Sequence, residues 1–399
     1  MKTTSLKVNT PEGHSGKLFN DAKDFTYRYH EDAPPETAIS LTMPVRHEEF
    51  RRQELHPIFQ MNLPEGYLLE QLRNRLAKTL NVDPMVLLAL SGSTSPIGRI
   101  QVRSETVDAL LEEHQFPGEN LQEILTWDGT EDICADILDR YILRAGISGV
   151  QPKVLVPERQ EGGQPRVTTK TSDLIIKSGR DEFPGLVINE FLCMSMAKEA
   201  GISVPPFYLS NNAKLFVMRR FDRDDLLNPI GFEDMAVLMG LSAHQKYSKS
   251  YAAIAKAIRV FCPPENRRSS LEQLFDSVAL SCIVGNGDAH LKNFGLLYSN
   301  PTQRDARLAP AYDIVNTTAY IPEDVLALDL AGNKSMFASR QGLLEFAHTC
   351  EIEQSAERIQ RLLASVEAVL ERYSEYREQA PHVFNAIEQS AAPFNLSFG

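Results

Sequence analysis

The segment VGNGDAHLKNFGLL, residues 284–297, joins an apolar helical pattern to an apolar strand pattern. Between the two patterns it gathers polar residues and a glycine within a few positions: Asn286, Gly287, Asp288, His290, Lys292 and Asn293. Polar groups at such a junction need water, a ligand or a metal ion to satisfy them. The five-residue spacing from Asp288 to Asn293 therefore needs a chemical explanation.

A hairpin after this segment predicts a third side chain at the same place. The stretches NFGLLYS, NPTQRDA and RLAPAYDIVN have the pattern of a strand, a turn and a strand, and Asp313 follows the second strand. Because a hairpin returns the chain to its origin, Asp313 is expected close to Asn293. Oxygen-bearing side chains of this kind suit Mg²⁺ that carries a nucleotide phosphate.

Protein kinases place the same residue types at the same spacing. Their catalytic loop carries an Asp base and an Asn five residues later, and a metal-binding Asp follows the next hairpin. By that pattern Asp288 is the catalytic base, and Asn293 and Asp313 are metal ligands. Lys177, in the strand pattern SDLIIKSG, would hold ATP phosphates, with Glu190 as its candidate partner. The alternatives are ordinary turns at a helix end and, for Lys177, a solvated lysine.

Two further segments are compatible with nucleotide binding. Gly146 and Gly149 of AGISGVQPK, residues 145–153, permit close approach of backbone amides to phosphate, and Ser148 between them would lie near the γ-phosphate. In MRRFDR, residues 218–223, backbone groups near Arg219 and Phe221 are placed to meet adenine if this stretch links two lobes. Plain turns explain both segments equally well.

The order of patterns along the chain predicts an α+β protein in three parts. Residues 1–105 have the pattern of a small α+β unit, with strands GKLFN, FTYRYH and AISLTMP and a helix over 63–80. Residues 106–230 carry the strands around Lys177, and residues 231–399 are mostly helical. The clearest helix there spans 269–285, with a capping-box pattern at Ser269 and Glu272 and a glycine, Gly285, at its end.

The composition is that of a globular protein and argues against several classes. The 399 residues are 43% hydrophobic, and the net charge of −12 weighs against a protein whose main partner is naked nucleic acid. Five cysteines without a CxxC pattern predict free thiols in a reducing cytosol. The N-terminus lacks the apolar core of a signal peptide and no apolar run is long enough to span a membrane, so we expect a cytoplasmic protein without a membrane partner.

Seven motifs in order carry a resemblance to one family: ISGVQPK, DLIIKSG, NEFLCMSMAKEAGISVP, RRFDR, FEDMAVLMG, NGDAHLKNF and LAPAYDIV. The sequence resembles the HipA-type serine/threonine kinase toxins of bacterial type II toxin–antitoxin systems. The stretch MPVRHEEFRRQELHPIFQMNLPEG looks like that family's N-terminal subdomain. The resemblance covers nearly the whole chain and implies a two-lobed kinase-like fold, distantly related to lipid kinases, with a small N-terminal α+β subdomain and a mainly helical C-terminal lobe.

The resemblance also implies the cofactors and the site. ATP and Mg²⁺ are expected, with Asp288 as the base and Asn293 and Asp313 at the metal. The loop at 148–153 would cover ATP. The residues expected to bind ATP are Ser148, Gly149, Val150, Gln151, Lys153, Lys177, Arg219, Phe221, His290, Lys292 and Tyr312.

Regulation and partners are implied in the same way. Family members inactivate themselves by phosphorylating a serine in or beside the ATP-covering loop. The position that carries it in some members is Gly146 here, so Ser148 is the candidate for autophosphorylation. The implied partners are a HipB-like helix-turn-helix antitoxin, operator DNA bound through that antitoxin, and a protein substrate such as an aminoacyl-tRNA synthetase. Two alternatives stay open: a kinase of lipids or metabolites, and a non-catalytic nucleotide-binding corepressor.

Overall fold

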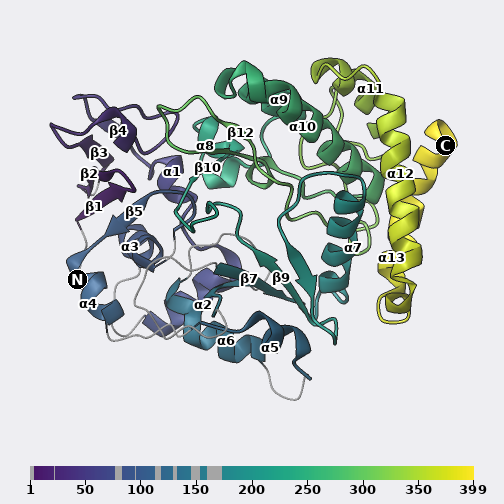
Figure 1. Cartoon of the computed structure of the whole chain (residues 1–399), viewed down its shortest axis with the longest axis horizontal. Coiled ribbons are helices and arrows are strands. Elements are labelled where there is room, and N and C mark those ends of the chain that lie inside the picture. The colour runs from purple at the N-terminus through teal and green to yellow at the C-terminus, as the bar shows by residue number, and fades with distance from the viewer. Residues whose placement is uncertain are drawn as a thin grey trace. The chain divides into compact units, whose positions relative to one another are not determined.

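The computed structural model describes residues 4–21, 23–76, 83–94, 96–112, 118–128, 133–144, 153–159 and 173–399 (Figure 1). The chain forms two compact units. Unit 1 comprises Met1–Ser178, Ser210–Ala243 and Leu297–Arg304, and unit 2 comprises Gly179–Leu209, His244–Leu296 and Asp305–Gly399. The boundaries expected from the sequence, after residues 105 and 230, stay a prediction.

Unit 1 begins with a five-stranded antiparallel sheet in the order β4-β3-β2-β1-β5. Its elements are β1 (Ser5–Thr10), β2 (Gly13–Asn20), β3 (Phe25–Tyr29), β4 (Phe50–Arg52) and β5 (Gln101–Arg103), with helices α1 (Pro57–Gln60), α2 (Gly66–Leu76) and α3 (Pro84–Thr94). Helix α3 is apolar on nearly all sides and packs on β1 and β5, so it supplies much of the core of this part.

One strand predicted in this part is wrong. The stretch AISLTMP forms only an isolated bridge between Ser40 and Met43, with a turn at Leu41 and Thr42 between them. Polar groups of this stretch donate hydrogen bonds to the buried carboxylate of Glu233 instead. Leu41 N donates to Oε1 at 2.8 Å, and Ser40 Oγ donates to Oε2 at 2.6 Å. The hydrogen bonds that a neighbouring strand would make to this stretch are thus made by a side chain from a distant part of the chain.

A second antiparallel arrangement in unit 1 carries strands in the order β6-β7-β9. These strands are β6 (Lys153–Pro157), β7 (Asp173–Ser178) and β9 (Leu215–Arg219), and the helices before them are α4 (Glu105–Glu112), α5 (Leu121–Thr126) and α6 (Ile133–Tyr141). Strand β10 (Gly231–Asp234) and helix α8 (Met235–Leu238) follow. The strands predicted around Lys177 are therefore confirmed.

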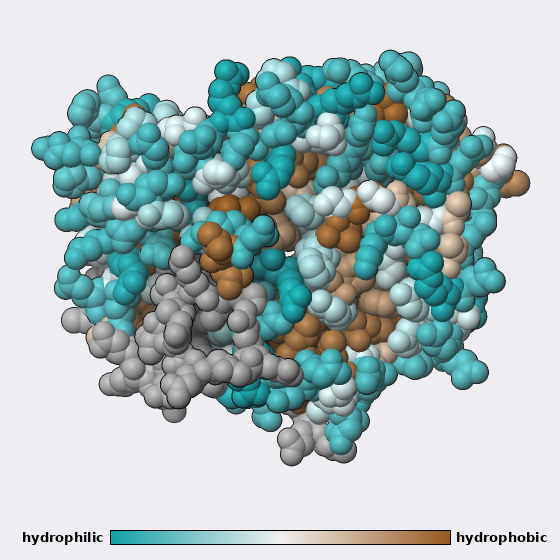
Figure 2. Space-filling model, viewed as in Figure 1, coloured by the Kyte–Doolittle hydropathy of each residue, from teal (hydrophilic) through white to brown (hydrophobic). Residues whose placement is uncertain are grey.

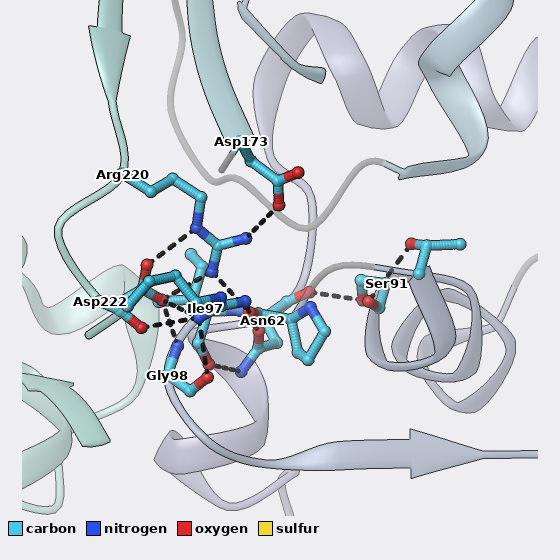
Figure 3. Close-up of polar contacts among 10 residues, drawn as sticks. Asn62, Ser91, Ile97, Gly98, Asp173, Arg220 and Asp222 are labelled. Atoms are coloured by element: carbon cyan, nitrogen blue, oxygen red, sulfur yellow. Dashed lines mark hydrogen bonds and ion pairs between the residues drawn. The ribbon is translucent and has the colours of Figure 1, made fainter. Parts of the chain in front are cut away.

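A buried charge network fixes the segment that leaves β9 (Figure 3). The guanidinium of Arg220 donates to Asp222 at 2.8 and 2.6 Å and to Asp173 at 3.1 Å. It also donates to the Pro96 carbonyl at 2.7 Å, and Gly98 N donates to Asp222 Oδ2 at 2.6 Å. The RRFDR segment is therefore tied to the loop that precedes β5.

Unit 2 is mainly helical, as the sequence predicts. Its elements are α7 (Leu186–Glu199), β8 (Phe207–Leu209), α9 (Tyr251–Phe261), α10 (Pro264–Val284), β12 (Arg307–Leu308), α11 (Ser339–Thr349), α12 (Ser355–Arg372) and α13 (Pro381–Phe398), and β11 (Gly295–Tyr298) begins in it. The long helices α12 and α13 lie side by side (Figure 1), and both pack against α10, which is buried over most of its length.

Helix α10 ends at the expected residue but begins earlier than its sequence pattern predicts. Gly285 caps its C-terminus in the left-handed conformation with φ 75°, as expected. The capping box is wrong, because α10 begins at Pro264 and Ser269 lies inside the helix, where its hydroxyl donates to the Asn266 carbonyl. Proline is favoured at the first position of a helix, so the helix begins at Pro264 rather than at Ser269.

Hydrophilic residues cover most of the face seen in Figure 2, with hydrophobic residues in small patches. The large apolar side chains of the described residues are mostly buried. Within those residues, every helix is too short or too polar to cross a membrane.

Candidate active site

The structure brings Asn293 and Asp313 together in unit 2. Asn293 ends a short 3-10 helix, Leu291–Asn293, directly before the first strand of the β11–β12 hairpin. The hairpin closes through Ala309 N, which donates to the Gly295 carbonyl at 2.9 Å. Asn293 Nδ2 then lies 3.5 Å from Asp313 Oδ2, as the hairpin argument predicts.

The chemistry of this pair fits a hard cation. Asn293 Oδ1 is buried and accepts no hydrogen bond from any residue that the structure describes, so an acceptor oxygen is held ready for a ligand. Asp313 has φ 61°, a conformation that costs a non-glycine residue of order 1 to 3 kcal/mol and is frequent at functional sites. An amide oxygen and a carboxylate are ligands that Mg²⁺ accepts.

Protein groups alone would not complete such a metal site. In the described parts of the chain, no three His, Cys, Asp or Glu side chains gather as metal ligands. Mg²⁺ commonly takes one or two carboxylates, waters and substrate phosphate oxygens rather than a full protein cage. The pair therefore suits a metal that arrives with a nucleotide.

Asp288 follows the C-terminus of α10 in a tight turn, where its own N donates to Asn286 Oδ1 at 3.0 Å. Its carboxylate is half-exposed and accepts a hydrogen bond from Tyr247 Oη at 2.7 Å. Partial burial raises the pKa of Asp288; the Tyr247 bond and Lys246 oppose that rise, while the charge of Asp313 adds to it. Such a carboxylate can accept a proton from a hydroxyl group.

His290 lies beside this carboxylate, with Nε2 3.9 Å from Asp288 Oδ1. Burial, with the nearby charge of Lys246, lowers the pKa of His290 to about 3. The imidazole is therefore neutral at physiological pH, and it contacts Asp288 as a neutral ring rather than as a cation.

Tyr312 and Lys292, both expected at the nucleotide, also meet. Tyr312 Oη donates to the Lys292 carbonyl at 2.7 Å, which ties the segment before Asp313 to the loop of residues 286–293. A small pocket, partly open to solvent, lies here. Its lining residues come from α10, the loop after it and the hairpin, and include Ser277, Ser281, Asn293, Pro310, Tyr312 and Asp313.

The residues that hold this geometry are ones that no sequence pattern singled out. Buried Asn316 donates from Nδ2 to the Val284 carbonyl at the end of α10, 2.5 Å away. Its backbone N donates to Asn189 Oδ1 at 2.7 Å, and Asn189 Nδ2 donates back to the Asn316 carbonyl at 2.7 Å. The chain after Asp313 is therefore fixed to α10 and to α7. The motifs NEF and DIVN contained both asparagines, but no local spacing pointed to their pairing.

Thr317 makes a second connection to the loop that carries Asp288. Gly287 N donates to Thr317 Oγ1 at 2.8 Å, and Thr317 Oγ1 donates to Asp324 Oδ2 at 2.5 Å. A Cβ on Gly287 would lie 2.1 Å from Asp324 Oδ2, so only glycine fits here without displacement. The turn that presents Asp288 depends on this close approach.

Lys153 and Lys177 form a cross-strand pair in unit 1. They are directly opposite each other in the β6–β7 register, and both are buried. The Lys177 ammonium also lies 5.7 Å from the centre of the Phe216 ring. Like charges directly opposite each other are unfavourable in a sheet. The role expected of both lysines at ATP phosphates stays a prediction.

Arg219 and Phe221 flank the buried Arg220. The Arg219 side chain is paired with Glu158 at 2.6 Å, and the Phe221 ring contacts Phe232 edge-on, with centroids 5.5 Å apart. Their side chains are thus engaged in packing, and the proposed adenine contacts would fall to their backbone groups. Those contacts stay a prediction.

Two parts of the expected site stay untested. Gly146, Ser148, Gly149, Val150 and Gln151 lie outside the described residues. Glu190 is buried in α7, in unit 2, whereas Lys177 belongs to unit 1. The pairing of Lys177 with Glu190 therefore also stays a prediction.

Comparison with protein families gives two matches in this chain. Residues 145–373 match the HipA-like C-terminal domain, and residues 6–103 match the HipA N-terminal domain. Among curated proteins, the chain is 28% identical over 379 residues to "Putative kinase Y4dM" of Sinorhizobium fredii, covering 88% of this chain and 84% of that protein. It is 22% identical to the serine/threonine-protein kinase toxin HipA of Shewanella oneidensis, covering 80% and 76%.

A solved structure has the same fold. A chain of the Shewanella oneidensis toxin–antitoxin complex of HipA, HipB and operator DNA superposes with a TM-score of 0.68 at 19% identity, and the match covers 98% of each chain. This likeness confirms the expected α+β, two-lobed kinase-like fold.

Proposed function

The chain belongs to the HipA family, and from that membership we propose that it is an ATP-dependent serine/threonine protein kinase and the toxin of a type II toxin–antitoxin system. The convergence of Asp288, Asn293 and Asp313 in unit 2 is the observation that carries this proposal. The names of the kinase relatives support the same activity.

The proposed reaction moves the γ-phosphoryl group of ATP to a protein hydroxyl. Asp288 accepts the hydroxyl proton while that oxygen forms a bond to the γ-phosphorus, and the bond to the β–γ bridging oxygen breaks, so that ADP leaves. Asn293 Oδ1 and Asp313 would hold Mg²⁺, which neutralises phosphate charge when it is bound. Burial lowers the pKa of His290, so the imidazole next to Asp288 is neutral at physiological pH and does not compete for that proton.

The remaining predicted residues would bind the nucleotide. Lys153 and Lys177 supply two positive charges to the phosphates from adjacent strands. Backbone groups near Arg219 and Phe221 would contact adenine, and Lys292 and Tyr312 would border the nucleotide. The loop of Ser148, Gly149, Val150 and Gln151 would cover ATP, with Ser148 as the autophosphorylation site.

We further propose the partners of this activity. A protein named HipA is solved with HipB and operator DNA, and a HipB-like helix-turn-helix antitoxin, with operator DNA through it, is proposed here by analogy. A cytoplasmic protein such as an aminoacyl-tRNA synthetase is the proposed substrate. A short helix-turn-helix gene beside this reading frame should encode the antitoxin, and its co-expression should relieve growth arrest caused by the kinase.

Purified protein incubated with Mg²⁺ and ATP tests the kinase reaction, with mass spectrometry as the readout. Phosphate is expected on Ser148 or on proteins of an added lysate. Asp288→Asn should lower transfer by about 10²- to 10⁴-fold. Asp225→Asn, at an exposed acid outside the site, is the matched control and should leave transfer unchanged.

Other results would replace the proposal. Absence of both nucleotide binding and phosphotransfer in the wild-type protein contradicts it. Transfer to lipids or metabolites alone identifies a kinase of another substrate class. A wild-type protein without toxicity, whose repression survives Asp313→Ala, would be a nucleotide-binding corepressor.

A further inference from the structure

Tyr247 contacts the proposed catalytic base, although no motif of the sequence includes it. It lies between a 3-10 turn, Ala243–Gln245, and helix α9. Its Oη donates a hydrogen bond to Asp288 Oδ1 at 2.7 Å. The distance is that of a charge-assisted hydrogen bond to a carboxylate, which is among the stronger hydrogen bonds in proteins.

Tyr247 is itself held against the catalytic loop. The Lys246 carbonyl accepts a bond from Leu291 N at 3.1 Å, so the backbone beside Tyr247 is attached to the loop that carries the site. The Tyr247 ring meets the buried His290 ring edge-on, with centroids 5.1 Å apart. A tyrosine fixed at the backbone and at the ring can hold a second group in one place.

Lys334 attaches the same segment to a third part of unit 2. Its ammonium donates to the Tyr247 carbonyl at 3.3 Å and to the Ala327 carbonyl at 2.8 Å. A parallel bridge between Ser250 and Asp329 continues this contact. The backbone on both sides of Tyr247 therefore has fixed neighbours.

Asp288 needs such support because its side chain is half-exposed. A surface carboxylate turns freely about its side-chain bonds, whereas a general base must lie within about 2.6 to 3.2 Å of the proton it takes. One hydrogen bond to Oδ1 restricts rotation of the carboxylate, and in the proposed role Oδ2 is the oxygen that takes the acceptor proton. Holding the group in place beforehand removes an entropy cost from the chemical step.

We propose that Tyr247 is a positioning residue for phosphoryl transfer, which holds the Asp288 carboxylate through its hydroxyl while Asp288 receives the acceptor proton. This inference rests on the proposed kinase function. It assigns Tyr247 no contact with ATP, so its loss should change the rate of transfer and leave nucleotide affinity unchanged.

The charges around Asp288 give the inference a second readout. Burial raises the pKa of this carboxyl, and the bond from Tyr247 and the charge of Lys246 act against that rise. Asp313 and Asp324 raise it further, and neutral His290 adds no charge. Loss of the Tyr247 hydroxyl therefore raises the pKa of Asp288, and the acid limb of the pH–rate profile should move to higher pH.

Tyr247→Phe tests the proposal in the full-length protein, with Mg²⁺ and ATP and with the protein's own hydroxyl groups as acceptor. The single-turnover rate at saturating ATP should fall by about 10- to 100-fold, while the ATP concentration for half-maximal rate stays the same. Tyr376→Phe removes a hydroxyl elsewhere in unit 2, from the 3-10 helix Ser374–Arg377, and should match wild type.

A carbon-detected NMR titration of Asp288, assigned with Asp288→Asn, needs no activity. The Asp288 pKa should be higher in Tyr247→Phe than in wild type. An equal pKa in both proteins would overturn the inference, as would a Tyr247→Phe enzyme as fast as, or faster than, an active wild type. A wild type that transfers no phosphate contradicts the proposed kinase function instead, and the titration still decides whether Tyr247 holds Asp288.

Discussion

Asn293 Nδ2 lies 3.5 Å from Asp313 Oδ2, although the two residues are twenty positions apart in the sequence. The contact places the amide toward the carboxylate, and Asn293 Oδ1 remains a buried acceptor without a donor among the described residues. A buried acceptor without a partner destabilises the folded state by about 1 to 3 kcal/mol. A bound cation would remove that cost by accepting the oxygen as a ligand.

Asp313→Asn should weaken Mg²⁺ binding in the presence of ATP. Loss of an outer-shell partner typically lowers metal affinity roughly tenfold. Loss of a negatively charged ligand should lower the Mg²⁺ affinity at least as much. Titration with Mn²⁺ as a paramagnetic probe, in the presence of a non-hydrolysable ATP analogue, measures the effect directly. Glu323→Gln removes an exposed charge from the same unit and should leave the affinity unchanged. Equal affinities in Asp313→Asn and wild type would remove Asp313 from the metal site.

Asp222→Asn should destabilise unit 1. Asp222 accepts from Arg220 and from Gly98 N at a buried place, and loss of its charge leaves Arg220 and Arg223 partly uncompensated. Breaking such a buried pair costs about 3 to 5 kcal/mol. The urea unfolding midpoint should fall, whereas Asp225→Asn, at an exposed acid nearby in sequence, should change it little. A midpoint equal to wild type would show that the network adds no net stability.

The same substitution has a pH signature. Burial alone would raise the pKa of Asp222, but Arg220 and Arg223 lower it overall. A depressed folded-state pKa gives stability that is present above the unfolded pKa, near 3.9, and is lost as pH falls toward the folded value. The stability difference between wild type and Asp222→Asn should therefore be constant near neutral pH and narrow below about pH 4. A difference that stays constant down to pH 2 would contradict the assigned pKa direction.

Local spacing made part of the site predictable. Asp288 and Asn293 belong to one loop, and a hairpin brings Asp313 back, so short-range geometry sufficed. The strand predicted over AISLTMP is wrong because the polar groups of this stretch bond to Glu233, far along the chain. Asn189 and Asn316 pair across distant positions in the same way, and no periodicity encodes such a contact. Sequence patterns therefore predict side chains that one turn or hairpin unites, and they miss the ones that tertiary packing brings together.

Asn316→Ala should loosen the link between the segment after Asp313 and the end of helix α10, which leads into the Asp288 loop. The change leaves the Val284 carbonyl and Ala319 N without the partners they have now. Each buried group left unpaired costs about 1 to 3 kcal/mol, so a loss of about 3 kcal/mol is expected. Thermal unfolding measures it, with the exposed Asn333→Ala as control. An unchanged melting temperature would mean that water or a backbone shift replaces the amide.

Gly287→Ala should lower catalysis more than stability. The new Cβ would meet Asp324 Oδ2 at 2.1 Å and the Val325 carbonyl at 2.7 Å, and one of these neighbours is backbone, so the turn itself must move. That turn carries Asp288, and displacement of a base by about 1 Å costs up to about 10²-fold in rate. The strain of one extra methyl group should cost stability only about 1 to 3 kcal/mol.

The matched control for this substitution is Gly179→Ala, because a Cβ there has no neighbour within 4 Å. The control should transfer phosphate at the wild-type rate, so a loss confined to Gly287→Ala isolates the contact with Asp324. If Gly287→Ala instead transfers as fast as the control while its melting temperature stays high, the loop tolerates the methyl group. The close approach of Gly287 to Asp324 would then have no part in placing the proposed base.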